Sequence, residues 1–163
     1  MSSDAVDTGW KIHAALADWT GKVDTKASFA LTIESALVAT VLTLSGQDRI
    51  FSALTACQQW WYGAGLVLIG TSIVCAALVV RPRLRTKALQ AESGRNYIYF
   101  GHLRYLTADK IADHLENTPI LPVLSQQLAA MSKIAWQKHR RVQISMTLAP
   151  AGVACMLVCA AIG

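Results

Sequence analysis

Three long apolar stretches dominate the pattern of hydrophobic and polar positions along this chain. They cover residues 27–44, 60–80 and 144–162. Each approaches the length of about 20 residues that a helix needs to cross a hydrocarbon core roughly 30 Å thick. Because lipid offers the backbone no hydrogen bonds, a helix is the expected form of each stretch. The pattern therefore predicts an all-α integral membrane protein with three transmembrane helices.

The stretches that precede the first and third spans also show helical periodicity. Apolar residues spaced alternately by four and three positions form one stripe before the first span: Ile12, Leu16, Trp19, Val23, Ala27 and Ala30. A similar stripe follows Pro119 and Pro122: Leu121, Leu124, Leu128, Met131 and Ala135. Such spacing favours helices. We expect one long helix over about 10–45, capped by Asp7 or Thr8, and a second that continues from its own arm into the third span.

The connector after the second span is predicted to be helical as well. We expect an extension of the second span, broken near Gly94 and Gly101, and then a helix over about 107–117. The predicted organisation is an N-terminal arm (1–26), a first span (27–46), an outer loop (47–59), a second span (60–80), a helical module (81–143) and a third span (144–162). Small residues such as Gly65, Gly70 and Gly152 would permit close helix approach in lipid.

The distribution of charge predicts the orientation. Residues 81–143 hold 11 Lys and Arg against 4 Asp and Glu, whereas the 47–59 loop holds only Asp48 and Arg49. The positive-inside rule places the basic module and the N-terminus in the cytoplasm and the C-terminus outside. The basic charge serves topology and lipid contact alone, or it also binds an anionic ligand. Because three spans make a poor pore, we expect a homo-oligomer if the protein conducts.

Composition and motifs argue against an enzyme. The chain is 53% hydrophobic and 15% charged, compared with about 25% charged in average proteins. The histidines have no Ser or Cys partner at a recognisable spacing, and no glycine-rich phosphate loop is present. No Cys/His set has the spacing of a metal site. We therefore expect no catalytic residue, no metal, no cofactor and no nucleic-acid partner.

Glu34 is the only ionisable residue inside a predicted span. A charged group at this depth costs roughly 2.5–3.5 kcal/mol on insertion scales, so it usually faces protein or water. Two interpretations stay open: a pore-lining or gate carboxylate, or a carboxyl hydrogen-bonded at a helix interface, with Thr71 or Ser72 as partner. Other pore or gate candidates are Asp24 and Lys26 at the inner boundary, and Pro150, which is expected to kink the third span.

A polar and aromatic cluster covers residues 95–104. Aromatic faces can stack on a base, Arg can neutralise phosphate, and Asn can read a base edge. The candidate nucleotide contacts are Arg95, Asn96, Tyr97, Tyr99, His102 and Arg104. An aromatic belt at a junction between helix and membrane explains the aromatic residues equally well.

Three short motifs in order resemble a known family. WTGKVDTKA (19–27) leads into the first span, YFGH (99–102) follows the second, and SKIA (132–135) with Lys138 precedes the third. This layout is similar to the transmembrane effectors of bacterial Pycsar anti-phage defence, PycTM, over nearly the whole chain. Glu34 is not part of the family pattern.

The resemblance implies a trigger and a partner. In such systems a neighbouring cyclase makes cyclic CMP or cyclic UMP, and the effector then damages the inner membrane so that the infected cell stops growing or dies. Two other functions remain open from the residues alone. One is a constitutive small channel or transporter subunit, and the other is a membrane scaffold that recruits a partner through its basic module.

Overall fold

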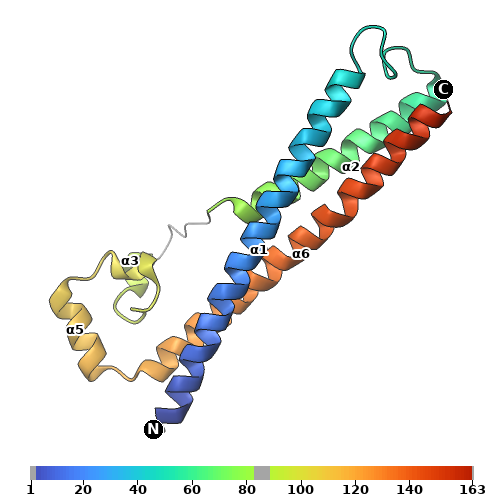
Figure 1. The fold of residues 1–163 in the computed structure, drawn as a ribbon. Coiled ribbons are helices and arrows are strands. Elements are labelled where there is room, and N and C mark those ends of the chain that lie inside the picture. The colour runs from blue at the N-terminus through green and yellow to red at the C-terminus, as the bar shows by residue number, and fades with distance from the viewer. Residues whose placement is uncertain (1–2, 83–88, 163) are drawn as a thin grey trace. The chain divides into compact units, whose positions relative to one another are not determined.

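The structure, a computed structural model, describes residues 3–82 and 89–162, and every regular element within these ranges is a helix. The helices are α1 (Ser3–Leu44), α2 (Ala56–Val80), α3 (Leu89–Glu92), α4 (Phe100–Leu103), α5 (Ala108–Asn117) and α6 (Ile120–Ala161), as Figure 1 shows. By length and composition, α1, α2 and α6 can each cross a membrane. The predicted all-α fold with three membrane-spanning helices is confirmed, whereas the position of the bilayer along them stays a prediction.

The chain divides into two compact units. The first, here called the polar unit, comprises Met1–Gly21 and Pro82–Trp136. The second, here called the bundle unit, comprises Lys22–Arg81 and Gln137–Gly163. α1 and α6 are each one continuous helix with residues in both units.

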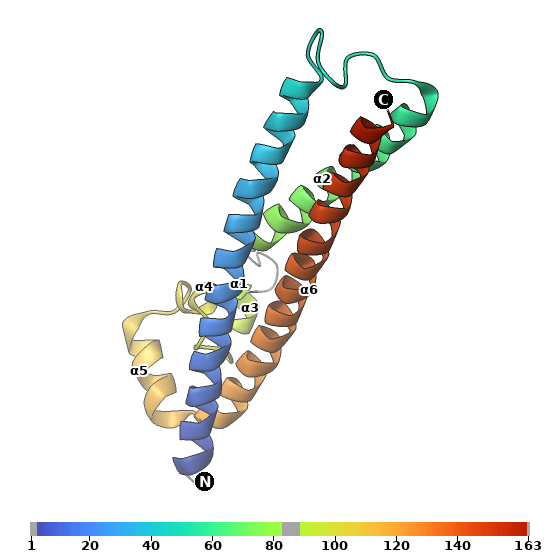
Figure 2. The same ribbon diagram turned by 45° about the vertical axis from the view of Figure 1, so that its right-hand side comes forward.

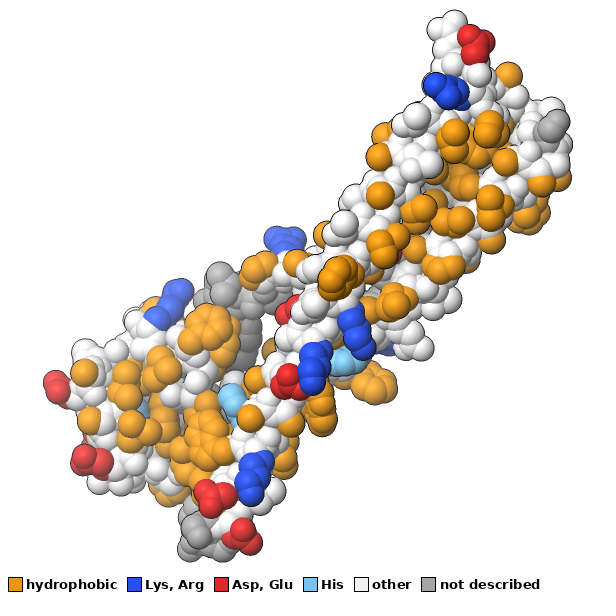
Figure 3. Space-filling view, in the orientation of Figure 1, with side chains coloured by type: hydrophobic (Ala, Val, Ile, Leu, Met, Phe, Trp, Pro, Cys, Tyr) orange, Lys and Arg blue, Asp and Glu red, His pale blue; other side chains and the backbone are white. Residues whose placement is uncertain are grey.

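In the bundle unit α1 and α6 run in the same direction and α2 runs against both, as the views in Figures 1 and 2 agree. Buried side chains from all three helices mark one end: Val23, Ala27, Val79 and Val142. A second buried cluster marks the other end: Val41, Phe51, Ile69, Met156 and Cys159. On the face visible in Figure 3, the part of these helices between the charged side chains near the two ends carries many hydrophobic side chains.

α1 begins earlier than predicted. It starts at Ser3, so Asp7 and Thr8 lie within the helix and do not cap it. The segment before Trp10 contains no proline that would break the helix. Asp4 in the first turn stabilises the helix start, because its negative charge lies at the positive end of the helix dipole. The sequence pattern therefore placed the start too late by about two turns, because polar residues without apolar periodicity can still continue a helix.

α2 begins at Ala56 and ends at Val80. At its start, the Gln58 backbone N–H donates to Thr55 Oγ1 and the Thr55 N–H donates to the Gln58 side chain, which forms a capping box. The predicted extension beyond the second span is wrong, because Arg81 takes an extended conformation before Pro82. A proline disfavours the helical region for the residue that precedes it.

The connector matches the prediction in part. α5 is confirmed, with Thr107 at its N-cap position. Gly101, in contrast, lies within the short helix α4 and breaks no helix. Three cations of the predicted basic module, Arg83, Arg85 and Lys87, lie outside the described residues.

α6 confirms the second predicted long helix. It follows Pro119 directly, and Pro122 stands in its first turn. A proline is tolerated there because the N–H groups of the first turn form no hydrogen bond within the helix. The helix continues through Pro150 to Ala161. The kink expected at Pro150 stays a prediction.

The backbones of α2 and α6 approach closely at two glycines. A Cβ on Gly152 would lie 3.0 Å from the Gly65 carbonyl oxygen and 3.2 Å from the Ile69 nitrogen. A Cβ on Gly65 would lie 3.0 Å from the Gly152 carbonyl oxygen. The prediction that small residues allow close approach is thus confirmed for this pair, whereas a Cβ on Gly70 would meet nothing within 4 Å.

Gly152→Ala should therefore destabilise the bundle by about 1–3 kcal/mol, because the added methyl group meets backbone atoms that cannot move aside alone. Gly70→Ala is the matched control and should be neutral or stabilising, since it adds a methyl group in open space and improves helix propensity. Unfolding midpoints in detergent micelles measure both effects. Equal midpoints for the two variants would contradict the close approach.

Candidate functional site

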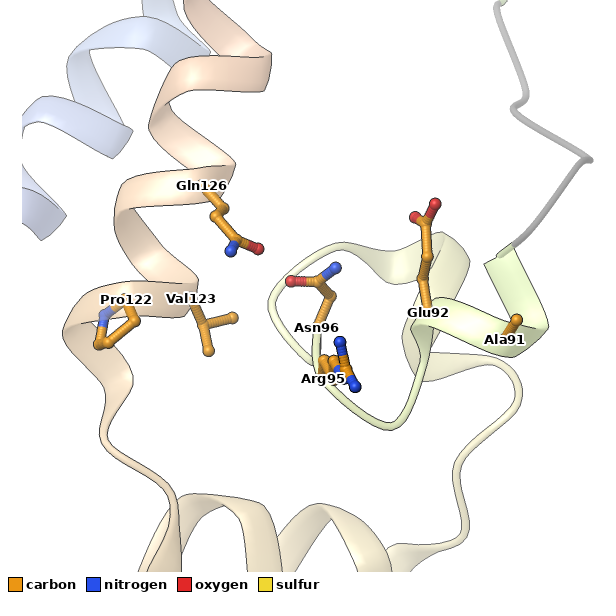
Figure 4. Close-up of a pocket in the computed structure, with 7 residues that line it drawn as sticks. All are labelled: Ala91, Glu92, Arg95, Asn96, Pro122, Val123 and Gln126. Atoms are coloured by element: carbon orange, nitrogen blue, oxygen red, sulfur yellow. The ribbon is translucent and has the colours of Figure 1, made fainter.

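A cavity of about 470 Å³ lies in the polar unit. It is lined by Ala91, Glu92, Arg95, Asn96, Pro122, Val123 and Gln126, which are drawn in Figure 4. One wall comes from α3 and the loop after it, and the other from the first turns of α6. The volume is within the range of about 300–1,000 Å³ that is typical of small-molecule sites.

The chemistry of the lining is mixed. Arg95 supplies a cation and Glu92 a carboxylate, while Pro122 and Val123 supply apolar surface. In Figure 4 the amide of Gln126 on α6 points across the cavity toward Asn96. Each amide can donate and accept hydrogen bonds. The cavity therefore offers a small ligand one cation, one carboxylate, two amides and some apolar surface.

Of the six predicted nucleotide contacts, Arg95 and Asn96 line this cavity and the other four do not. Glu92 and Gln126 line the cavity but are not among the predicted contacts. Glu92 stands three positions before Arg95, a spacing that could have indicated it. Gln126 is distant in the chain and shows no comparable signal.

His102 is buried, with 5% of its surface exposed, and is not among the residues that line the cavity. Its Nε2 is 3.3 Å from Glu92 Oε2, so the tautomer that carries the proton on Nε2 donates to the carboxylate. Among the described residues no hydrogen-bond partner is found for His102 Nδ1. His102 therefore does not line the cavity but contacts Glu92, which does.

Tyr97 belongs to the core of the polar unit. It is 4% exposed, its ring stacks on His114 with centroids 5.2 Å apart, and its hydroxyl donates to the Thr118 carbonyl at 3.3 Å. Burial raises the pKa of Tyr97 above its ordinary value of 10.0. Because one ring face is already covered by His114, this side chain fits a structural role.

Tyr99 and Arg104 also make contacts within the polar unit. The Tyr99 ring packs against Phe100 and against His102, with centroids 4.5 Å and 5.5 Å apart. The Arg104 guanidinium lies 4.5 Å from the centre of the Tyr105 ring and donates a hydrogen bond to its hydroxyl. The predicted cluster thus divides into Arg95 and Asn96, which line the cavity, and four residues that contact other side chains of the polar unit.

Glu34 lies in the bundle unit with 2% of its surface exposed. Its Oε1 accepts a hydrogen bond from Ser145 Oγ at 2.6 Å and a short one from Ser72 Oγ. Ser72 Oγ also lies 3.0 Å from the Ser145 carbonyl oxygen. The three residues, here called the carboxyl–serine cluster, join α1, α2 and α6.

This geometry bears on the two interpretations of Glu34. In one chain the carboxyl faces a helix interface, and the expected partner Ser72 is present. Thr71, the other expected partner, donates to the Val67 carbonyl of its own helix. Ser145 was missed, because a serine in an apolar span carries no sequence signal that distinguishes an interhelical bond from one to its own backbone.

The other pore or gate candidates do not gather around Glu34. Asp24 forms an ion pair with Lys138 on α6, with Nζ–O distances of 2.6 and 2.7 Å, a partner that the sequence analysis did not identify. Lys26 and Pro150 are exposed on the surface of the bundle unit. Within the described ranges, no group of three or more His, Cys, Asp or Glu side chains could hold a metal ion.

Comparison with known proteins supports the resemblance drawn from the motifs. Residues 8–163 match the family model of the Pycsar effector protein domain, PycTM. The chain is also similar to the Pycsar effector protein PtPycTM of Propioniciclava tarda, with 23% identity over 172 residues that cover 98% of this chain and 82% of that protein. No solved structure matches.

The burial of Tyr97 predicts a loss of stability in alkali. Above pH 10 the unfolded chain releases the phenolic proton, whereas the folded chain retains it to higher pH, so unfolding becomes more favourable as pH rises. Below pH 10 this contribution is fully present. Tyr97→Phe should reduce the fall in unfolding midpoint between pH 9 and 11, and should cost about 1 kcal/mol at neutral pH for the lost hydrogen bond.

Tyr105→Phe is the control, because Tyr105 is exposed and its variant should retain the alkaline fall of the wild-type protein. Thermal unfolding at several pH values measures the slopes. Identical slopes for the wild-type protein and Tyr97→Phe would exclude a buried phenol at this position.

Proposed function

Because the chain belongs to the Pycsar effector family of bacterial anti-phage defence, we propose that it is a membrane effector activated by a cyclic pyrimidine mononucleotide. Cyclic CMP or cyclic UMP, made by a neighbouring cyclase during infection, binds the polar unit. The bundle unit then impairs the inner membrane, and the infected cell dies or stops growing before phage is released.

The observation that supports this ligand site is that Arg95 lines the same cavity as the amides of Asn96 and Gln126. A cyclic mononucleotide has one negative charge, on its phosphate, and Arg95 can meet it with a charge-assisted hydrogen bond. Asn96 and Gln126 can bond the edge of a pyrimidine, and Val123 can pack against the ring. The cavity has room for one such nucleotide.

The signal reaches the membrane through α6. This helix carries the cavity wall at Val123 and Gln126 and the cluster serine Ser145, and it is continuous between them. A ligand shifts an equilibrium only by its differential affinity for the two states. The nucleotide therefore has to favour a position of α6 in which the carboxyl–serine cluster is broken.

Glu34 acts as the gate residue in this scheme. In the resting state its carboxyl ties the three helices of one chain together. When the hydrogen bonds from Ser72 and Ser145 break, the Glu34 carboxyl is released from the helix interface and can face water. Three helices of one chain enclose little space, so the conducting form is a homo-oligomer of the effector.

The proposed orientation follows the positive-inside rule. The basic polar unit and the N-terminus face the cytoplasm, where the cyclase releases its product, and the C-terminus faces outward. The bundle unit contacts membrane lipid with its apolar surface (Figure 3).

Dye release from liposomes that carry the full chain tests the proposal. Cyclic CMP or cyclic UMP should trigger release, whereas linear CMP and UMP should not. Release in every condition would favour the constitutive channel, and no release by verified inserted protein would favour the scaffold.

Arg95→Ala should raise the nucleotide concentration for half-maximal release roughly ten- to a hundredfold, since a hydrogen bond to a charged group contributes about 1.5–3 kcal/mol. Arg104→Ala is the matched control: Arg104 does not line the cavity, and its variant should respond like the wild-type protein. Nucleotide binding can be measured directly on the same preparations. If Arg104→Ala weakens binding and Arg95→Ala does not, the cavity is the wrong site.

Two substitutions at Glu34 distinguish a role in linking the helices by hydrogen bonds from a role in lining the pore. Glu34→Leu removes the hydrogen bonds to Ser72 and Ser145 and should cause release without nucleotide. Glu34→Gln retains a carbonyl acceptor and should stay closed until nucleotide is added. Ser35→Ala is the control, because Ser35 bonds only the Leu31 carbonyl of its own helix in the described contacts.

The opposite pattern would support the other interpretation. If Glu34→Gln abolishes nucleotide-triggered release while the resting state stays closed, the charge of the carboxylate is needed in the open pore.

A further inference from the structure

The polar side chains of the cavity differ in how strictly their hydrogen bonds can discriminate one nucleotide base from another. The amides of Asn96 and Gln126 can each present a donor or an acceptor by turning about the last side-chain bond. An ionised carboxylate accepts hydrogen bonds and cannot donate them. Among these three cavity residues, Glu92 is therefore the one that can only accept hydrogen bonds from a base.

His102 constrains the Glu92 carboxylate. The imidazole is 5% exposed, comes from α4, and places Nε2 within 3.3 Å of Glu92 Oε2. Its ring is further packed edge-on against Tyr99, with centroids 5.5 Å apart. A carboxylate can accept several hydrogen bonds at once, so it can bond a ligand while it retains His102.

Cytosine and uracil present different groups to such an acceptor. Cytosine has an exocyclic amine with two hydrogens. Uracil has a carbonyl oxygen at that position, and its one Watson–Crick ring N–H stands between two carbonyl oxygens. A carboxylate that reaches the uracil N–H is therefore brought close to oxygens that repel it. Carboxylate acceptance from the cytosine amine is an established mode of base recognition.

From these contacts we propose that Glu92, positioned by His102, makes the cavity selective for cytosine, so that cyclic CMP rather than cyclic UMP is the activating ligand. The inference rests on the proposed function and adds the identity of the base. In this arrangement Arg95 binds the phosphate, and the amides adapt to the remaining polar atoms of the ring.

Binding of cyclic CMP and of cyclic UMP to the full chain in lipid nanodiscs tests the inference. The wild-type protein should bind cyclic CMP at least about fivefold more tightly than cyclic UMP, as a discrimination of about 1–3 kcal/mol implies. Glu92→Gln should bring the ratio of the two dissociation constants close to one, because an amide can turn to serve either base. Glu116→Gln, an exposed neutralisation on α5, should keep the wild-type ratio.

The positioning role of His102 is tested by rescue. His102→Leu removes the donor to Glu92 and should reduce the ratio, whereas His102→Gln retains an amide donor and should restore most of it. A purely structural role would lower the affinity for both nucleotides equally and leave their ratio unchanged.

The outcomes distinguish this inference from the proposed function. Equal or tighter binding of cyclic UMP by the wild-type protein, or an unchanged ratio in Glu92→Gln, would overturn the cytosine preference alone. Binding of neither nucleotide by correctly inserted protein would overturn the proposed function, and this inference with it.

Discussion

A carboxyl group among apolar helices has to find its hydrogen-bond partners on neighbouring helices, because hydrocarbon offers none. Glu34 meets this constraint through Oε1, which accepts hydrogen bonds from hydroxyls of α2 and α6, so one side chain on α1 links all three helices of the bundle unit. No partner is found for Glu34 Oε2 among the described residues. The apolar contacts above and below are non-directional and would tolerate several arrangements. The cluster, together with the glycine contact at Gly65 and Gly152, selects one of them.

The polar side chains of the polar unit divide into those that pack on other rings and those that line the cavity. Tyr97 is covered by His114 in the core of the polar unit, whereas the Arg104 guanidinium lies over the ring of its neighbour Tyr105. Arg95 and Asn96, which directly precede Tyr97 in the chain, line the cavity instead. Neighbours in the sequence thus serve different purposes, because the irregular chain between α3 and α4 turns successive side chains in different directions.

The elements that the sequence predicts well are those with local physical causes. Apolar runs define the membrane helices, and prolines mark the start of α6. The predicted start of α1 is wrong because the first turns of this helix are polar and show no apolar periodicity. The predicted extension of α2 is wrong because Pro82 disfavours a helical conformation at Arg81. The site was predictable only where it is local. Gln126 and Ser145 join their partners through the alignment of separate helices, which spacing along one chain does not encode.

The carboxyl–serine cluster has a consequence for rotation about a helix axis. Successive residues of an α-helix are separated by about 100° around the axis, so a twist of α6 by one position would turn Ser145 away from Glu34. The adjacent residues, Ile144 and Met146, have no hydroxyl to replace it. The hydrogen bond between Ser145 and Glu34 therefore depends on the rotation of α6 about its own axis, and a twist by one position would leave the carboxyl with Ser72 as its remaining serine partner.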